Sequence, residues 1–287
     1  MSDGGAEPLG IIAGGGDLPL RLAQGAQAAG RPVFILGIEG WAEPGSFGAW
    51  PHGFARLGAG RSMLDQLQAH GCRQLVIAGR AKRPSLTAIR PDAVTARALA
   101  KIGTAYFSGD DGLMKAIIRF LAEEGFEVLP VQDVLHDILP GPGPLGAALP
   151  DAMARADIAR GIAVVRALGA VDVGQGCVVQ QGMVLAVEAI EGTDAMLARA
   201  ATLRRDGPGG VLVKLTKPGQ DRRVDLPTIG PLTVAGAAAA GLRGIAVEAH
   251  GTLVVDRERM VQAADQAGIF VTAIRPDKFN PEEEITP

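Results

Sequence analysis

Residues 9–19 read Leu-Gly-Ile-Ile-Ala-Gly-Gly-Gly-Asp-Leu-Pro, a short apolar run that opens into three glycines and an aspartate. The run Leu9–Ala13 predicts a buried strand, and Asp17 is suited to cap a helix that ends near Gly30. A glycine-rich turn between a strand and a helix is typical of α/β domains that bind nucleotides. This stretch therefore predicts an α/β fold that begins with a strand, a loop and a helix.

The same alternation of strands and helices continues through the first half of the chain. Apolar runs predict further strands at Pro32–Gly37, Leu75–Ala78 and Glu127–Pro130. Helical spacing predicts helices around 63–67, over Asp92–Ile102 and from an Asp110-Asp111 cap onward. Repeated strand-helix units of this length favour a parallel sheet covered by helices, so residues 1–136 are predicted to form a Rossmann-like nucleotide-binding domain.

A stretch rich in proline and glycine follows, and it separates this half from a second domain. Residues 137–150 hold four prolines and three glycines after Leu139, which predicts a linker. Residues 151–287 are predicted to form a C-terminal catalytic α/β domain of α+β character. Its expected strands and helices are a helix through Ile158 and Leu168, a hairpin of Cys177–Val179 with Met183–Ile190, a helix Thr193–Arg204, a strand Val211–Leu215, a helix Pro231–Leu242, a hairpin of Ile245–Ala249 with Thr252–Val255, a helix Glu258–Gln266 and a strand Phe270–Ile274.

Composition excludes several classes of protein. Glycine is abundant, at 40 of 287 residues, but it has no every-third-residue period, and 47% apolar residues argue against disorder. A net charge of −3 gives no basic field for nucleic acid. Cys72 and Cys177 stand alone, which favours two buried thiols in a reduced compartment. With no signal peptide or spanning segment, a cytoplasmic location is expected, with at most peripheral contact at the inner membrane face.

The glycine loop is the first candidate binding site. Backbone N–H groups and the positive end of a helix dipole favour a phosphate there. The candidate residues of this loop are Gly14, Gly15, Gly16, Asp17 and Leu18. The loop lacks the spacing of a dinucleotide fingerprint, because Pro19 stands at the position of the last glycine. A tight turn without a ligand is the alternative.

Two further loops carry cations or exposed amides near predicted strand and helix ends. Gly79, Arg80 and Lys82 follow the strand Leu75–Ala78, where open α/β sheets bind their ligands. Asp111 and Gly112 stand at a helix start, and Lys115 lies one turn further on. A solvated basic loop and a simple helix cap are the alternative interpretations.

The densest group of charges runs from Lys214 to Gly230 and includes two structure breakers, Pro218 and Pro227. Cations there suit a phosphate ester, and a carboxylate suits a metal ion or a water molecule. The candidates from this group are Lys214, Lys217, Gln220, Asp221, Arg223, Asp225 and Thr228. An exposed charged loop with weak ion pairs is the alternative.

A second acidic group precedes it in the sequence. Glu188 and Glu191 are expected at a strand end, where they would join Asp225 around a metal, and Gly192 follows them. Thr193 or Asp194 is expected to cap the next helix. The four histidines have no zinc-like spacing, and a hairpin leading into a capped helix is the alternative.

Three of these motifs together resemble those of the LpxI family. They are Gly10-Ile-Ile-Ala-Gly-Gly-Gly-Asp-Leu-Pro19, Glu191-Gly-Thr-Asp194 and Lys217-Pro-Gly-Gln-Asp-Arg-Arg-Val-Asp-Leu-Pro-Thr-Ile-Gly230. The resemblance implies hydrolysis of UDP-2,3-diacylglucosamine, a lipid-linked nucleotide sugar, to UMP and 2,3-diacylglucosamine 1-phosphate (lipid X). It also implies dependence on Mg²⁺ and an essential carboxylate at Asp225. Together with the acidic group described above, Asp225 and Glu188 are the expected metal ligands.

Two other functions are compatible with the same residues. A non-catalytic protein that binds nucleotide sugars would use the same phosphate-binding loops, and a Rossmann-type oxidoreductase would place Glu39 at a ribose. Neither function needs Asp225. The assembly of the chain is left open between a monomer and a homodimer.

Overall fold

The computed structural model describes residues 6–81, 89–103 and 109–285. The chain forms two compact units. The first comprises Met1–His136 together with Asp221–Asp225, and the second comprises Asp137–Gln220 together with Leu226–Pro287. The short segment Asp221–Asp225 therefore packs with the first unit, although the predicted domain boundaries assign it to the second.

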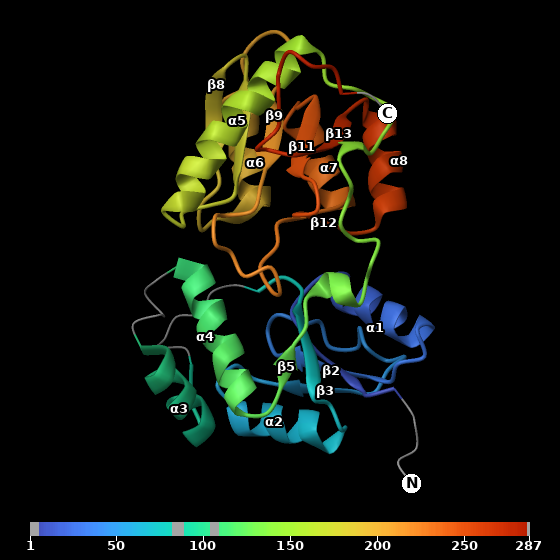
Figure 1. The fold of residues 1–287 in the computed structure, drawn as a ribbon, viewed down its shortest axis with the longest axis vertical. Coiled ribbons are helices and arrows are strands. Elements are labelled where there is room, and N and C mark those ends of the chain that lie inside the picture. The colour runs from blue at the N-terminus through green and yellow to red at the C-terminus, as the bar shows by residue number, and fades with distance from the viewer. Residues whose placement is uncertain (1–5, 82–88, 104–108, 286–287) are drawn as a thin grey trace. The chain divides into compact units, whose positions relative to one another are not determined.

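The first unit is built on a parallel sheet, drawn in blue to green in Figure 1. Its described strands are β1 (Leu9–Ala13), β2 (Val33–Ile38), β3 (His52–Ala55), β4 (Gln74–Ala78) and β5 (Glu127–Val128). Their order is β3-β2-β1-β4-β5, and every neighbouring pair is parallel. The predicted α/β class with a parallel sheet is therefore confirmed. The strand β3 was not predicted, because His52 and Gly53 break its apolar pattern.

Helices cover both faces of this sheet. They are α1 (Leu18–Ala28), α2 (Gly60–Ala69), α3 (Ala93–Ile102) and α4 (Gly109–Glu123). Alternate residues of β2 explain the layering, since Phe34 and Leu36 pack with α2, α3 and α4 in one apolar cluster. On the other face α1 packs along β1 and β2 and buries Leu22 and Ala23.

The second unit contains a six-stranded mixed sheet among its described residues. Its strands are β6 (Gly143–Pro144), β7 (Gly176–Gln180), β8 (Met183–Val187), β9 (Val211–Lys214), β11 (Gly244–Glu248) and β13 (Phe270–Ile274). The order is β6-β13-β11-β9-β7-β8, in which β9, β11 and β13 are parallel. The hairpin of β7 and β8 is as predicted.

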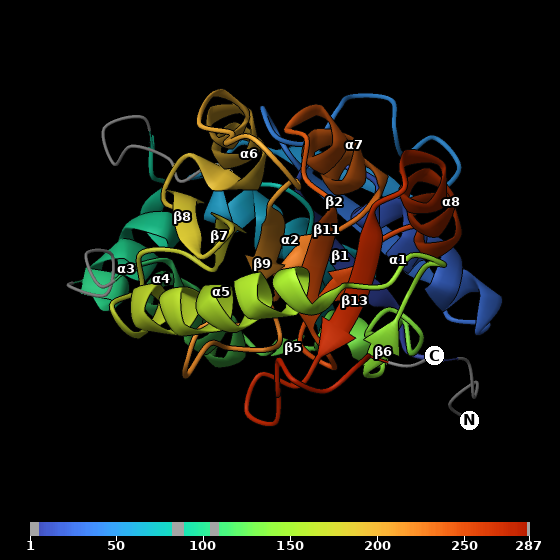
Figure 2. The same ribbon diagram turned by 90° about the horizontal axis from the view of Figure 1, so that it is seen from above.

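Four helices flank this sheet. They are α5 (Ala152–Ala170), α6 (Gly192–Thr202), α7 (Pro231–Ala239) and α8 (Arg257–Ala267). Figure 2 shows α5 on one face and the other three helices on the opposite face. Two separate apolar clusters match these layers, one with Ile158 and Val165 of α5 and one with Met196, Val234 and Met260 of the other helices. No helix within the described ranges has the length and apolarity needed to cross a bilayer.

Two expectations for this half are wrong. The strand Leu253–Val254 (β12) does not form a hairpin with β11, because it pairs in parallel with Thr228–Ile229 (β10). Residues 137–150 are not a free linker either. Gly143 and Pro144 pair at the sheet edge with β13, a position that tolerates proline, and Ile138 is buried at 2% exposure.

Candidate functional site

In the first unit, the glycine loop lies between β1 and α1 and is bonded to the loop after β4. The Gly14 N–H donates to the Ala78 carbonyl at 2.8 Å. Gly15 and Arg80 exchange two backbone hydrogen bonds, of 2.9 and 2.7 Å. Two of the amides expected to bind phosphate are therefore already used within the protein.

The loop after β1 and the loop after β4 approach each other so closely that Gly14 and Gly79 have no room for a side chain. A Cβ atom on residue 14 would lie 2.5 Å from the Arg80 carbonyl oxygen, and one on residue 79 would lie 2.8 Å from the carbonyl carbon of Gly14. Gly79 also has a φ of +101°, which side chains with a Cβ rarely adopt. The sheet order reverses between β1 and β4, so these loops meet at the switch point of the sheet.

At the exposed end of the glycine loop, the side chain of Arg80 lies near the start of α1. A Cβ on Gly16 would lie 3.4 Å from Nε of Arg80, so the guanidinium lies over the loop where α1 begins. Asp17 occupies the N-cap position but makes no side-chain cap bond, contrary to expectation, because its backbone is already helical. Gly16, Leu18 and Arg80 thus remain the strongest candidates for an anion in this unit.

Some predicted residues of this unit cannot be placed. Lys82 lies outside the described residues, as do the side chains of Asp110 and Asp111. The backbone of α4 begins at Gly109, so Asp111 and Gly112 lie inside its first turn rather than before it. Lys115 projects from the same helix and is exposed.

The segment Asp221–Asp225 forms a single helical turn in the first unit. The N–H groups of Val224 and Asp225 both donate to the Asp221 carbonyl at 3.3 Å, and Val224 packs on the apolar cluster of this unit. The turn is fixed at its start by Asp221, whose carboxylate accepts from the Arg223 N–H at 3.0 Å. It leaves Asp225 half-buried at the end of the turn.

Asp221 and Arg223 bind each other through two side-chain hydrogen bonds, of 2.9 and 2.6 Å. These bonds hold the pKa of Asp221 below its usual value, and the nearby charge of Lys115 lowers it further. The same pair raises the pKa of Arg223. In this arrangement Asp221 neutralises Arg223 and brings Lys115 close to the turn that carries Asp225.

In the second unit, Lys214 ends β9 and is 4% exposed. Its Nζ lies 3.2 and 3.4 Å from the two carboxylate oxygens of Glu188, which is 6% exposed, and it also donates to the Thr193 hydroxyl. Thr193 in turn donates to Glu188 at 2.5 Å. Lys214 therefore neutralises a buried carboxylate, which argues against its expected contact with substrate phosphates.

The start of α6 differs from the predicted cap. The N-cap position is Glu191, which makes no side-chain cap bond, and Gly192 has a φ of +78°. Hydrogen bonds from its own backbone N–H and from Arg199 hold the pKa of Glu191 below its usual value. Asp194 is exposed in the first turn, where its charge complements the helix dipole. Thr193 does not cap the helix, because its hydroxyl bonds Glu188.

The loop after β9 is held by side chains of neighbouring loops. Glu248, at the end of β11, accepts from the Thr216 N–H at 3.0 Å and from its hydroxyl. Lys217 donates to Asp172 at 2.6 Å. Sequence reasoning missed Glu248 and Asp172, and a carboxylate at the end of an apolar strand was the available signal for Glu248.

Two further residues predicted to bind substrate have structural partners. Gln220 accepts from the Lys217 N–H at 2.9 Å and donates to Gln175 at 3.3 Å. Thr228 is exposed on β10, and its hydroxyl donates to the Leu226 carbonyl at 3.3 Å. Gln220 therefore shapes the loop that leads along the chain to Asp221.

The described residues contain no group of three or more histidine, cysteine or acidic side chains that would hold a metal ion. Glu188 fits the expected metal role poorly, because both of its carboxylate oxygens face the ammonium group of Lys214. Asp225 belongs to the first unit by its contacts, whereas Glu188 belongs to the second.

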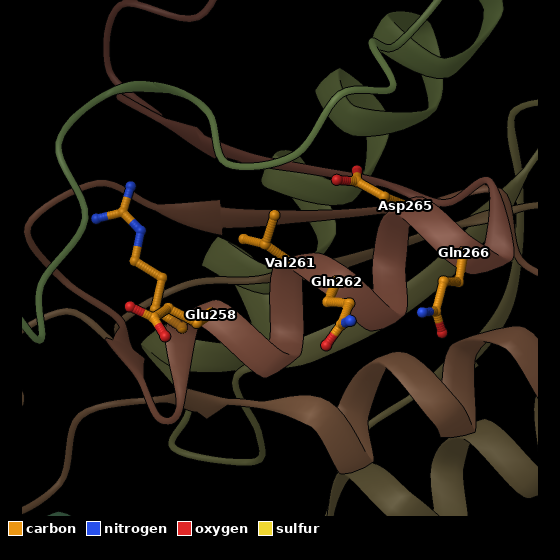
Figure 3. A pocket seen from close by; sticks show the side chains of 6 residues that line it. Glu258, Val261, Gln262, Asp265 and Gln266 are labelled. Atoms are coloured by element: carbon orange, nitrogen blue, oxygen red, sulfur yellow. The ribbon is translucent and has the colours of Figure 1, made fainter.

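A surface hollow of about 550 Å³ lies elsewhere, along α8 of the second unit (Figure 3). Its walls are Arg257, Glu258, Val261, Gln262, Asp265 and Gln266. They all come from one helix, and none of the described residues predicted to bind substrate is among them. The hollow therefore does not define the functional site.

Both units place glycine-rich or charged loops at the carboxyl ends of parallel strands, as α/β proteins that bind phosphorylated ligands do. Comparison with known proteins assigns the family. The chain belongs to the LpxI family, since the model of the LpxI N-terminal domain matches residues 8–138 and that of the LpxI C-terminal domain matches residues 141–272. It is 42% identical over 276 residues to UDP-2,3-diacylglucosamine pyrophosphatase LpxI of Caulobacter vibrioides, which covers 94% of this chain and 98% of that protein.

Proposed function

We infer that this protein is a UDP-2,3-diacylglucosamine pyrophosphatase. It adds water across the pyrophosphate and releases UMP and 2,3-diacylglucosamine 1-phosphate. The observation that carries this inference is the 42% identity over nearly the whole length of both proteins. A match of this extent includes both halves of the chain in order, and it places Asp225 and the 217–230 motif within the aligned family domain.

The first unit is proposed to be a Rossmann-like nucleotide-binding domain. Its order β3-β2-β1-β4-β5 equals the first five positions of a doubly wound sheet, whose ligands bind at the switch point. Gly16 and Arg80 lie at that point, and a guanidinium suits the pyrophosphate of a nucleoside diphosphate sugar.

Asp225 is proposed as the essential carboxylate. The turn that begins at Asp221 leaves it half-buried and fixes its backbone through the bond to the Asp221 carbonyl. A carboxylate held in this way can orient the attacking water or hold a metal ion. Cleavage of the anhydride consumes one water molecule and leaves two phosphate monoesters, so no other reactant is required.

Mg²⁺ is proposed as the cofactor, with Asp225 as its protein ligand. Mg²⁺ in phosphate-processing sites is often bound by one or two carboxylates together with phosphates and water, so a site with one protein carboxylate is sufficient. When bound, the ion would neutralise charge on the pyrophosphate. Glu188 is left out of this proposal, because Lys214 already neutralises it.

The two acyl chains of the proposed substrate need apolar contacts with the protein. Ile190 is 95% exposed on the loop before α6, and Val171 is 68% exposed on the loop after α5. These loops touch, since a Cβ on Gly174 would lie 1.9 Å from the Glu188 carbonyl oxygen. We propose that they contact lipid, which would bring the protein to the cytoplasmic face of the membrane only peripherally.

The function is tested by release of UMP from UDP-2,3-diacylglucosamine, measured by liquid chromatography. Asp225→Asn should lower kcat by at least about 10³-fold while the variant still binds substrate, since it removes the charge that holds water or metal. Asp206→Asn, on an exposed loop, is the matched control and should retain normal activity. Chelation by EDTA should abolish turnover, and added Mg²⁺ should restore it.

Two results would favour the alternative functions instead. Intact substrate after prolonged incubation of the wild-type protein with Mg²⁺ would indicate a non-catalytic binding protein. Tight binding of NADH, seen as a change in nicotinamide fluorescence, would indicate an oxidoreductase. Normal turnover by Asp225→Asn would leave the activity in place but refute the role of this residue.

A further inference from the structure

Lys214, Glu188 and Thr193 form a closed set of polar contacts inside the second unit. Lys214 ends β9, Glu188 directly follows β8, and Thr193 lies in the first turn of α6. The ammonium group contacts both Glu188 oxygens and the Thr193 hydroxyl, and that hydroxyl contacts Glu188. Each of the three side chains therefore contacts the other two.

The surrounding backbone is shaped to admit this set. A Cβ on residue 176 would lie 2.8 Å from Oε2 of Glu188, and one on residue 174 would collide with the Glu188 carbonyl oxygen. Gly176 is also the register partner of Lys214 on the neighbouring strand. Glycine at 174 leaves room for the main chain of Glu188, and glycine at 176 leaves room for its carboxylate, so the fold accommodates the contact with Lys214.

A buried ion pair of this kind commonly adds little to the stability of a protein. Removing an ammonium and a carboxylate from water costs more than their attraction commonly returns, and apolar residues of similar volume are often as stable or more so. A buried ion pair does, however, require one geometry of the segments that carry it. Here those segments are the start of α6, with its Glu191-Gly-Thr-Asp194 motif, and the first residue of the loop 215–220.

We propose that Lys214, with Glu188 and Thr193, is a positioning residue for the pyrophosphatase reaction. It locks the 191–194 turn against the end of β9 and so sets the geometry of that motif and of residues 217–220, with which the 217–230 motif begins. Lys214 does this without touching substrate, because its ammonium group is enclosed by its two partners. The proposal rests on the proposed function, since its readout is hydrolysis of the lipid-linked nucleotide sugar.

The decisive variant replaces the pair by apolar side chains of similar size. Lys214→Met combined with Glu188→Met should unfold within about 3 °C of the wild-type Tm, because no unpaired buried charge is left. Its kcat/KM for UMP release should nevertheless fall about 100-fold, since a small misplacement of binding groups has effects of this order. Arg166→Met, which removes an exposed ion pair with Asp277, is the control and should change neither quantity.

Thr193 supplies a second test that does not depend on the double variant folding. Thr193→Val should lower kcat/KM about tenfold, whereas Thr193→Ser, which keeps the hydroxyl, should restore it to within about twofold at an unchanged Tm. Wild-type kcat/KM in either the double variant or Thr193→Val would overturn the positioning role. Failure of the wild-type protein itself to release UMP would refute the proposed function instead, so the two failures are distinguishable.

Discussion

The loop after β1 and the loop after β9 each follow an inner strand of their own unit, but they are held in different ways. The loop after β1 is fixed by main-chain hydrogen bonds between Gly14, Gly15 and the loop that carries Arg80. The loop after β9 is fixed by side chains, through the bond of Thr216 to Glu248 and that of Lys217 to Asp172. The first arrangement depends on the absence of Cβ atoms, and the second depends on charged side chains, Glu248 as a hydrogen-bond acceptor and Asp172 as an ion-pair partner.

This difference predicts different sensitivities to substitution. Adding any side chain to the loop held by its backbone should lower the stability of the protein, whatever the polarity of that side chain, because the neighbouring main chain occupies the space. Where charged side chains hold the structure, removing one partner should lower the stability of the protein, and replacing both partners by apolar side chains should restore it. Five measurements can break or sharpen this distinction.

The largest effect is expected for Lys214→Met alone. The substitution leaves Glu188 charged and buried without its cation, which should lower the free energy of unfolding by about 3–5 kcal/mol. Urea denaturation of the single and double variants measures this directly. If Lys214→Met cost less than about 1 kcal/mol, the charges would not be what holds this part of the second unit.

A slightly smaller effect is expected for Gly79→Ala. The φ of +101° and the 2.8 Å approach to Gly14 together predict a loss of about 2–4 kcal/mol. Gly30→Ala is the matched control, because its φ of +74° is also positive but no atom lies within 4 Å of the added Cβ. The control should cost about 1–2 kcal/mol, the strain of the backbone alone.

Labelling of the two free cysteines can show in which unit a substitution increases local opening. Burial raises the pKa of Cys72, in the first unit, to about 11 and that of Cys177, in the second, to about 12. Gly79→Ala should therefore speed thiol labelling of Cys72 and leave Cys177 unchanged, with mass spectrometry as the readout. Equal acceleration at both cysteines would mean that the two loops are not independent.

Much of this architecture could be predicted from the sequence, because it depends on local patterns. Apolar runs between glycines located β1, β2 and β4, and helical spacing located α5 and α8. The failure at β12 has a local cause as well. His250-Gly251 looks like a hairpin turn, yet Leu253 pairs with Thr228, a residue 25 positions away that sits in a strand of only two residues.

The pairing of charges could not be predicted in the same way. The group from Lys214 to Thr228 was identified as a whole, but Lys214 is neutralised by Glu188, 26 residues upstream, and Lys217 by Asp172, 45 residues upstream. Side-chain partners across a sheet depend on strand order and register, which a single sequence specifies only weakly. Asp221 and Arg223 are the exception, because their pairing lies within one turn.

A moderate effect is expected for Glu248→Ala. It leaves the Thr216 N–H without its acceptor in a half-buried position, which should cost about 1–3 kcal/mol. Glu248→Gln keeps an acceptor oxygen at the same place and should cost less than half as much. Thermal unfolding of both variants tests this, and equal losses would show that the carboxylate charge, rather than hydrogen bonding, secures Thr216.

The smallest effect is expected in the pH dependence of the Tm. It distinguishes the turn Asp221–Asp225, which the Asp221–Arg223 pair holds, from the glycine loop after β1. The pKa of Asp221 lies below its ordinary value of 3.8 in the folded protein, chiefly because Arg223 donates to it. Its contribution to stability is thus fully present above pH 3.8 and is lost as the pH falls through the lowered pKa. The Tm difference between wild type and Asp221→Asn should hold from pH 6 down to about pH 4 and shrink as the pH falls further through the lowered pKa, whereas that between wild type and Gly79→Ala should stay constant. Arg223→Gln removes the donor and should shrink the acid dependence as Asp221→Asn does. An Asp221→Asn difference that stayed constant with pH would show that this turn is held by its backbone bonds, as the glycine loop is.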